Sequence, residues 1–422
     1  MSQRHDDPPA PGLDRRAFLR VSALAGAALG LLPFGAGAET AEAPRVRGLR
    51  TLGRTGLEVS DIGFGSSRLE GDEALVRHAL ERGIRYFDTA ESYTGGRSEE
   101  TLGRALVGHR DEVVLASKTS AEAGSTKDEL MRALEGSLRR LQTDRIDVYF
   151  NHAVNEVRRL QNPEWPEFVS RAKAAGKIRF TGMSGHGGRL VECLDFAIDH
   201  DLVDVVLVGY NFGQDPAFLQ RFTRNFDFVA VQEDLPRVLA KARAKGVGVV
   251  AMKTLRGARL NDMKPFEQPG GTFPQAAFRW VLSSPNVDAL VVTMREPAQV
   301  DEYLAASGTQ GPSLADLRLL ERYEARNGRE QCRYGCSRCE SACPEGVPIA
   351  DVLRTRMYAE DYGDLGLARS EYAALATDAT ACLTCAHRAC TGGCPHGLEL
   401  PALTLRAHRS IGASVARNGE NA

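Results

Sequence analysis

The chain contains 422 residues, of which 43% are hydrophobic and 26% are charged. This length is enough for two or three domains with their own cores, and the composition is that of a soluble globular protein. Lys and Arg number 53 against 55 Asp and Glu, which gives a formal net charge of -2. Such a balance provides no electrostatic attraction for nucleic acid, so we expect no nucleic-acid partner.

The first 38 residues have the order of regions found in an export signal. Arg15-Arg16 precedes the mildly apolar run Val21–Leu32, and Ala36-Gly37-Ala38 supplies small residues for a signal peptidase. Paired arginines before a weakly apolar core resemble the twin-arginine signal, whose export machinery carries folded proteins. We therefore expect a periplasmic protein, with the signal either cleaved or kept as an anchor. The apolar run is shorter than the ~20 residues that span a bilayer, and no transmembrane segment is expected after cleavage. The alternative is a disordered basic tail with an incidental apolar helix.

Short β-rich apolar runs alternate with amphipathic segments from residue 49 onward. Eight βα units over about 250 residues predict a parallel (β/α)8 barrel, whose active site lies at the carboxyl ends of the strands. A doubly wound open sheet is the alternative, but no Gly-x-Gly-x-x-Gly follows the first strand. The predicted strands are Val59–Gly63, Ile84–Asp88, Val113–Lys118, Ile146–His152, Ile178–Ser184, Val205–Tyr210, Val247–Met252 and Leu290–Met294. The predicted helices include Glu73–Arg82, Lys127–Leu141, Trp165–Ala175 and Arg189–His200, and Gly83, Gly176 and Gly246 are expected to end helices.

Four polar residues lie at or just after the ends of predicted strands two to four, where a barrel would gather them at one mouth. They are Asp88, Tyr93, Lys118 and His152. Tyr93 is expected to act as acid or base on a substrate oxygen, although a free tyrosine has a pKa of about 10. A buried Lys118 ammonium is expected to lower the pKa of Tyr93, with Asp88 keeping Lys118 charged. His152 is expected to orient the carbonyl or to share the proton.

These residues and their surroundings resemble the aldo/keto reductase family. The motif Thr51-Leu52-Gly53-Arg54-Thr55-Gly56-Leu57 is similar to the family's N-terminal hairpin, and Ser98-Glu99-Glu100-Thr101-Leu102-Gly103 also follows the family pattern. The resemblance implies that Asp88, Tyr93, Lys118 and His152 are the family's catalytic tetrad. It also implies an oxidoreductase that interconverts a carbonyl and an alcohol on a small-molecule substrate.

The resemblance further implies a nicotinamide nucleotide, NADP or NAD, at the barrel mouth. Ser184 retains the serine that holds the carboxamide and Tyr210 persists, but Gly185 and Leu207 replace the family's usual Asn and Gln. The other nucleotide contacts that it implies are Lys253 and Arg256 in the pyrophosphate loop, and Arg295, Gln299 and Glu302 at the adenosine end. A guanidinium suits a 2′-phosphate, yet Arg295 leaves the choice between NADP and NAD open.

Eight of the nine cysteines form two motifs that each end in Cys-Pro. The motifs are Cys332-x3-Cys336-x2-Cys339-x3-Cys343 and Cys382-x2-Cys385-x4-Cys390-x3-Cys394. Such spacing is typical of [4Fe-4S] ligands, so we predict two clusters. By analogy with two-cluster ferredoxins, Cys394 joins the first three cysteines at one cluster, and Cys343 joins Cys382, Cys385 and Cys390 at the other. Local ligation, a single cluster, structural zinc and disulfides are the alternatives. The ninth, Cys193, is interpreted as a buried apolar residue.

The sequence therefore predicts three parts. Residues 1–38 form the signal, 49–310 the barrel, and 311–422 a mainly helical, ferredoxin-like iron–sulfur domain that begins with a helical linker over 312–329. The resemblance is to the family branch with such a tail, and the clusters are expected to pass electrons to or from a redox partner protein or a quinone. Because free nicotinamide nucleotide is scarce outside the cytoplasm, one alternative is an electron-transfer subunit whose barrel no longer uses nicotinamide. Another is that the cysteine region is only a structural brace or docking module.

Overall fold

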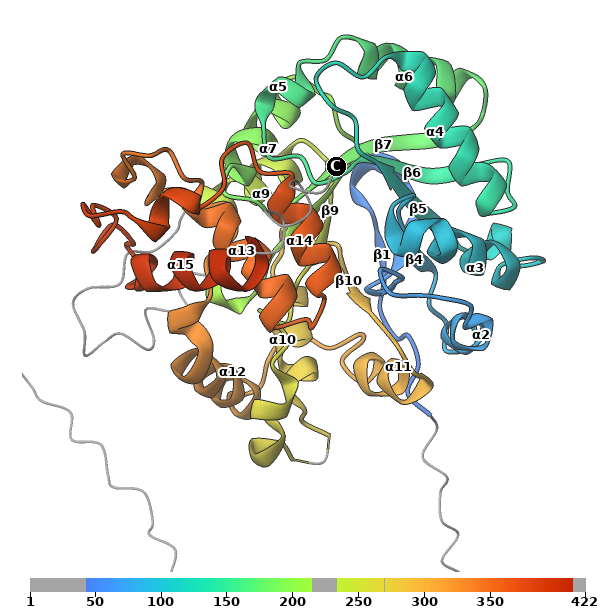
Figure 1. The fold of residues 1–422 in the computed structure, drawn as a ribbon. Coiled ribbons are helices and arrows are strands. Elements are labelled where there is room, and N and C mark those ends of the chain that lie inside the picture. Colours follow the sequence, from blue (N-terminus) through green and yellow to red (C-terminus); the bar gives the residue numbers. More distant parts are fainter. Residues whose placement is uncertain (1–42, 215–233, 269, 413–422) are drawn as a thin grey trace, which may run out of the picture. The chain divides into compact units, whose positions relative to one another are not determined.

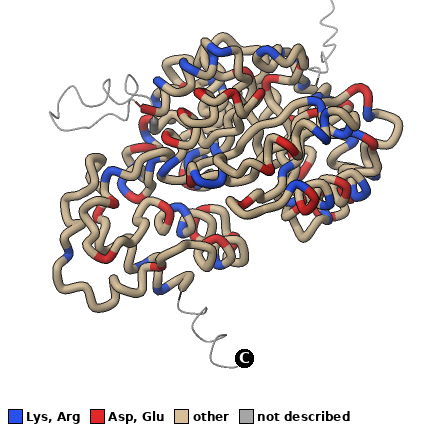
Figure 2. The backbone as a smooth tube through the Cα atoms, turned by 90° about the horizontal axis from the view of Figure 1, so that it is seen from above, with Lys and Arg blue, Asp and Glu red and all other residues tan. Residues whose placement is uncertain are grey.

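The computed structural model describes residues 43–214, 234–268 and 270–412. Within it, the compact unit begins at Pro44 and includes both the barrel and the cysteine-rich region. The predicted twin-arginine signal, residues 1–38, lies outside the described residues. Of the helices in the described ranges, none has both the length and the apolar character that crossing a membrane requires. Basic and acidic residues are intermixed along the backbone in the view of Figure 2.

Eight parallel strands close into a barrel in the order β10-β3-β4-β5-β6-β7-β8-β9 (Figure 1). The predicted (β/α)8 barrel is therefore confirmed. Its interior is filled by apolar side chains such as Tyr86, Val148 and Leu207, and Leu52 of the N-terminal hairpin joins the same cluster. The strands are β3 (Ile62–Gly65), β4 (Tyr86–Asp88), β5 (Val114–Thr119), β6 (Ile146–Asn151), β7 (Ile178–Gly185), β8 (Val205–Gly209), β9 (Gly248–Met252) and β10 (Ala289–Thr293).

The first predicted strand, Val59–Gly63, differs most from the structure, whereas the boundaries of the other seven differ by no more than two residues. The structure divides it between β2 (Glu58–Ser60), which pairs antiparallel with β1 (Leu49–Thr51), and the barrel strand β3. The chain bends at Asp61, whose carboxylate accepts hydrogen bonds from Ser307 Oγ and Gly308 N, each at 2.7 Å. These partners lie almost 250 residues away in sequence, so no local pattern marks the bend.

Helices cover the outside of the barrel between successive strands, as the amphipathic segments predicted. Gly83, Gly176 and Gly246 follow helices in the left-handed backbone region, with φ of 88°, 69° and 69°, which confirms the predicted helix ends. The helices are α2 (Glu73–Glu81), α3 (Arg97–Ala105), α4 (Lys127–Arg140), α5 (Val157–Leu160), α6 (Glu164–Ala174), α7 (Leu190–Asp199), α9 (Asp234–Ala244), α10 (Phe273–Leu282) and α11 (Pro297–Leu304).

The C-terminal region is mainly helical, as predicted, and α13, α14 and α15 pack on one another (orange to red in Figure 1). The region has its own apolar core, which includes Val352, Leu353 and Leu403. The predicted linker is helix α12, and it packs against α10 of the barrel. The helices are α12 (Leu314–Asn327), α13 (Ile349–Glu360), α14 (Leu365–Ala373) and α15 (Leu400–Ile411).

Candidate functional site

A buried ion pair joins the carboxyl ends of β4 and β5. Lys118 Nζ lies 2.6 Å from Asp88 Oδ1, and the two side chains are only 1% and 5% exposed. Lys118 also donates a hydrogen bond to the carbonyl oxygen of Thr89. Burial lowers the pKa of Lys118 and raises the pKa of Asp88, whereas each charge favours the ionised form of the other. The pair is therefore an ionic anchor at the barrel mouth.

Tyr93 and His152 lie beside this pair. Tyr93 begins a 3₁₀ turn in which Thr94 and Gly95 adopt left-handed conformations, with φ of 51° and 66°. The Lys118 ammonium lies 4.8 Å from the centroid of the Tyr93 ring. The imidazole of His152 meets that ring edge-on at a centroid distance of 5.7 Å. The structure thus brings together all four residues that the sequence singled out.

The electrostatics of the group differ from the expectation in one respect. Burial raises the pKa of Tyr93, and the carboxylates of Asp88 and Glu371 raise it further. The expected lowering of the Tyr93 pKa by Lys118 is not found, and burial has the largest effect. Burial and the charges of Lys118, Arg159 and Lys253 lower the pKa of His152 to about 3. Near neutral pH the site therefore presents a protonated phenol and a neutral imidazole.

Comparison with known proteins agrees with this geometry. A sequence model described as the Aldo/keto reductase family matches residues 61–272, about half of the chain. The chain belongs to the aldo/keto reductase family. The matched residues include the four site residues described above, whereas the eight clustered cysteines lie beyond residue 272.

Individual aldo/keto reductase relatives are similar over the barrel. An uncharacterized oxidoreductase of Bacillus subtilis, YqkF, is 35% identical over 298 residues, covering 64% of this chain and 95% of its own. The L-galactose dehydrogenase of Arabidopsis thaliana is 27% identical over 295 residues, covering 61% of this chain and 87% of its own. The solved structure of aldo-keto reductase AKR11C1 from Bacillus halodurans (holo form) has a TM-score of 0.51 at 23% identity, covering 65% of this chain and 95% of its own. This last likeness concerns the fold alone.

The residues that the aldo/keto reductase resemblance assigned to nicotinamide lie in a tightly packed region. Ser184 is 1% exposed, and its hydroxyl accepts a hydrogen bond from Ala153 N at 2.9 Å. A Cβ at Gly185 would lie 2.8 Å from Leu190 Cδ1, so an asparagine would not fit there without rearrangement. Tyr210 is 4% exposed and packs on Trp280 at a ring distance of 5.4 Å.

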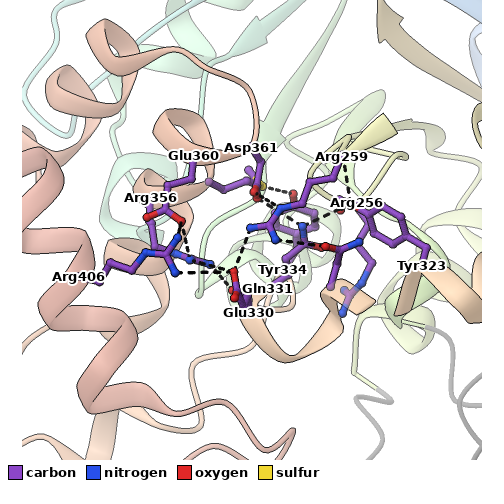
Figure 3. A network of polar contacts seen from close by, with 12 residues as sticks. Arg256, Arg259, Tyr323, Glu330, Gln331, Tyr334, Arg356, Glu360, Asp361 and Arg406 are labelled. Atoms are coloured by element: carbon purple, nitrogen blue, oxygen red, sulfur yellow. Dashed lines mark hydrogen bonds and ion pairs between the residues drawn. The ribbon is translucent and has the colours of Figure 1, made fainter. Parts of the chain in front are cut away.

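The loop after β9, where an aldo/keto reductase would grip pyrophosphate, is bound by the C-terminal region (Figure 3). Arg256 is 2% exposed and donates two hydrogen bonds to the Glu324 carboxylate, at 2.6 and 2.8 Å. The Tyr323 hydroxyl donates to the carbonyl oxygen of Arg256. A Cβ at Gly257, whose φ is 89°, would overlap the side-chain amide of Gln331. The predicted pyrophosphate contact Arg256 is thus already engaged by α12.

Further contacts extend this attachment across the barrel mouth. Arg259 donates to Asp361 at 2.7 Å and to Glu330 at 3.1 Å. Tyr334 lies against the end of β8, where a Cβ at Gly209 would be 2.9 Å from its ring. One cavity beside these contacts, lined by His186, Gly257 and Gln331 among others, measures about 20 Å³. That is room for about one water molecule.

The predicted adenosine contacts lie apart from this network, on or just before α11. The backbone N–H of Arg295 donates to Gln299 Oε1 at 2.9 Å. The carbonyl oxygen of Glu302 accepts from Gln275 Nε2 at 3.0 Å. The structure therefore does not bring Arg295, Gln299 and Glu302 into the group formed by Arg256 and Glu324.

Sequence reasoning missed several residues of the C-terminal region that reach the mouth, among them Arg354, Tyr358 and Glu371. Arg354 donates to His186 Nδ1 at 3.3 Å and pairs with Glu371 at 3.2 Å. Because a guanidinium only donates, a neutral His186 carries its proton on Nε2 and donates it to the Tyr358 oxygen, 3.1 Å away. The sequence contains one indication of this contact, which is that His186 comes just after a predicted strand. No sequence motif includes Tyr358.

The eight clustered cysteines form two groups that each draw on both motifs. Burial and then the charges of Cys336, Cys339 and Cys394 raise the pKa of Cys332. Burial and then Cys343, Cys390 and Cys385 raise the pKa of Cys382 to about 11. All nine cysteines are free thiols, and Cys193 is fully buried in α7, as predicted. No three His, Cys, Asp or Glu side chains in the described part of the chain are arranged to hold a single metal ion.

Proposed function

We propose that this member of the aldo/keto reductase family is an iron–sulfur oxidoreductase that interconverts a carbonyl and an alcohol. The observation that carries the proposal is the buried Lys118–Asp88 pair beside Tyr93, with the neutral imidazole of His152 in edge-on contact with the Tyr93 ring. Reduction of one carbonyl takes up two electrons, which the two clusters would supply, and two protons. Tyr93 donates the proton that binds the substrate oxygen, water supplies the proton that binds the carbon, and the Lys118 ammonium stabilises the phenolate left behind. His152 donates a hydrogen bond that orients the carbonyl.

A nicotinamide nucleotide has support from family membership, because aldo/keto reductases typically use NADP(H). The residues of this chain do not fit that group in the family's manner. Arg256 is bound to Glu324, the loop after β9 is covered, and Gly185 has no space for an amide side chain. The proposed reaction therefore does not include a nucleotide. These observations favour the second candidate, an electron-transfer protein whose barrel does not use nicotinamide.

Two [4Fe-4S] clusters are proposed as the electron carriers. The donor set fits, because the thiols fall into two groups of four and a cubane cluster takes four thiolates. Free thiols give no support to the disulfide alternative, and the lack of a single-ion arrangement in the described residues gives none to zinc. When bound, the clusters would supply single electrons, so oxidation of one alcohol, which releases two electrons and two protons, would reduce two clusters.

Location and partner belong to the same proposal. A twin-arginine signal suits a protein that receives its clusters before export, so we propose a periplasmic protein. A redox partner protein or a quinone would then exchange electrons with the clusters. Purification from a periplasmic fraction with iron already bound would support this part, and a cytoplasmic location would overturn it.

The reaction is tested with protein reduced by dithionite under anaerobic conditions and then freed of reductant. Small aldehydes, ketones and oxo acids are added, and the return of visible cluster absorbance is followed. We expect one class to reoxidise the clusters, and Tyr93→Phe to slow that step by about 10²- to 10⁴-fold. Failure of every carbonyl would overturn the reaction. A colourless protein without iron would overturn the clusters. Bleaching of the oxidised clusters by NADH or NADPH would show instead that the reaction depends on a nucleotide.

Cluster ligation is tested with two double variants that remove the same number of cysteines. Cys332→Ser/Cys394→Ser removes two thiols from one structural group, whereas Cys332→Ser/Cys343→Ser removes one from each. With crossed ligation the first variant should keep about half of the iron and the second should lose most of it. Iron analysis and electron paramagnetic resonance measure the outcome. If the second variant keeps about half of the iron and the first loses most of it, ligation is local instead.

A further inference from the structure

We infer that Lys253 is a binding residue for a carboxylate on the substrate, so that the site takes a small oxo or hydroxy acid rather than an uncharged carbonyl. This inference rests on the proposed carbonyl–alcohol reaction at Tyr93 and names its substrate class.

The backbone holds Lys253 at the barrel mouth in a conformation that few side-chain-bearing residues adopt. It follows the end of β9 with φ of 56°, in the left-handed region. The side-chain amide of Asn211 donates to the Lys253 carbonyl oxygen at 3.3 Å. Left-handed residues other than glycine cost free energy and are concentrated at functional sites. The conformation is thus a fixed feature of this loop.

The ammonium of Lys253 is enclosed by aromatic rings of the C-terminal region. Its Nζ lies 4.5 Å from the centroid of Tyr358 and 5.5 Å from that of Tyr362. Aromatic faces stabilise a cation but do not neutralise it. The hydroxyl of Tyr358 accepts from His186, and its phenol interacts electrostatically with Tyr93. Tyr358 therefore links Lys253 to the proposed acid–base group, and the Lys253 charge also acts on His152 of that group.

The charges around the site leave Lys253 without an ion-pair partner. Lys118 is paired with Asp88, and Arg354 with Glu371 and Asp351. Arg159 donates to three backbone carbonyl oxygens and to the Asn151 amide oxygen. No carboxylate in the described ranges lies within 4.0 Å of the Lys253 ammonium. Glu371 attracts it only from a longer distance.

The lone charge raises the electrostatic potential where the substrate oxygen would bind. Lys253 is one of three cations that lower the pKa of His152, and none of the carboxylates in the described ranges raises it. Burial and Arg354 lower the pKa of Lys253 itself to about 7. An anion beside the ammonium would remove this penalty. A substrate that places its carbonyl oxygen at Tyr93 and His152 would bring an attached carboxylate toward Lys253.

The probe is oxamate, an amide analogue of a small oxo acid, and binding to the full iron-loaded chain is measured by calorimetry at pH 6. We expect Lys253→Gln to weaken binding by about 10- to 100-fold, the loss of one hydrogen bond to a charged group. Lys264→Gln, at an exposed lysine of the same loop, should leave binding unchanged. The uncharged analogue oxamide should bind weakly and to the same extent in all three proteins.

Equal oxamate affinity in wild type and Lys253→Gln, or no binding to wild type, would overturn the inference. Cluster absorbance and thermal unfolding check that the variant is folded, and Lys253→Met provides a second variant if it is not. Oxamate binding that depends on Lys253, without reoxidation of reduced clusters by any oxo acid, would overturn the proposed reaction and leave the carboxylate site standing. Reoxidation of reduced clusters by uncharged ketones alone would support the proposed reaction and overturn the carboxylate site.

Discussion

Replacing Lys118 with Met is expected to lower the free energy of unfolding by about 3–5 kcal/mol, because it leaves the Asp88 carboxylate buried without its partner. The pair is 2.6 Å apart and almost fully shielded from water. Chemical denaturation of the purified protein measures the loss. Removing both charges in Lys118→Met/Asp88→Asn should recover most of it, since the cost comes from the unpaired charge and not from the lost contact.

The loss should also depend on pH in a defined direction. Without Lys118, the pKa of the buried Asp88, already raised by burial, rises further above its unfolded value. The unfolded state then releases the proton first as pH increases, so the variant loses stability from about pH 4 upward. The deficit should therefore be smaller at pH 4 than at pH 8. Arg171→Met, which breaks an exposed pair with Asp128, should cost less than about 1 kcal/mol at either pH. A deficit that does not change with pH would contradict the unpaired-charge explanation.

Arg256→Ala is expected to lower the free energy of unfolding by about 3 kcal/mol, because Glu324 is left largely buried and loses both of its short hydrogen bonds. Arg333, 3.6 Å from the same carboxylate, limits the loss. Arg295→Ala serves as the control, since it removes the other arginine assigned to a nucleotide, and it should change stability by no more than about 0.5 kcal/mol.

The comparison separates two roles for Arg256. An arginine whose role is to bind a phosphate does not stabilise the ligand-free protein. Its removal would therefore leave the stability of the ligand-free protein unchanged or raise it. An arginine that attaches α12 to the barrel is needed at all times. Denaturation of both variants in the absence of nucleotide decides between them, and equal stabilities for Arg256→Ala and Arg295→Ala would contradict the attachment.

The barrel and its acid–base group could be predicted from the sequence because both depend on local order. Strand-forming runs and helix-ending glycines recur along the chain, and a parallel barrel brings every strand end to one mouth. Asp88, Lys118 and His152 needed no further information to be placed together. The bend at Asp61 was missed because Ser307 and Gly308 cause it, and their contact has no sequence signature.

The contacts of the C-terminal region could not be predicted for the same reason. Arg256 meets Glu324 across 68 residues and His186 meets Tyr358 across 172, and neither pair belongs to a motif. The raised pKa of Tyr93 follows from burial and then from the charges of Asp88 and Glu371, of which only Asp88 could be predicted as a neighbour. Side chains that close a site from a distant segment are recognised only when the chain is folded.

The attachment of α12 and α13 to the loop after β9 also has a consequence for the order of assembly. During translation, strands β3 to β10 are synthesised before the segment that binds Arg256 and Arg259. The barrel mouth consequently stays incomplete until translation is nearly finished, and long-range contacts of this kind slow folding. Termination before residue 324 would leave both arginines without these acidic partners, and termination between residues 331 and 360 would still remove Asp361 from Arg259. The barrel mouth is thus complete only after the C-terminal region has been synthesised, and this cysteine-containing region also covers the mouth.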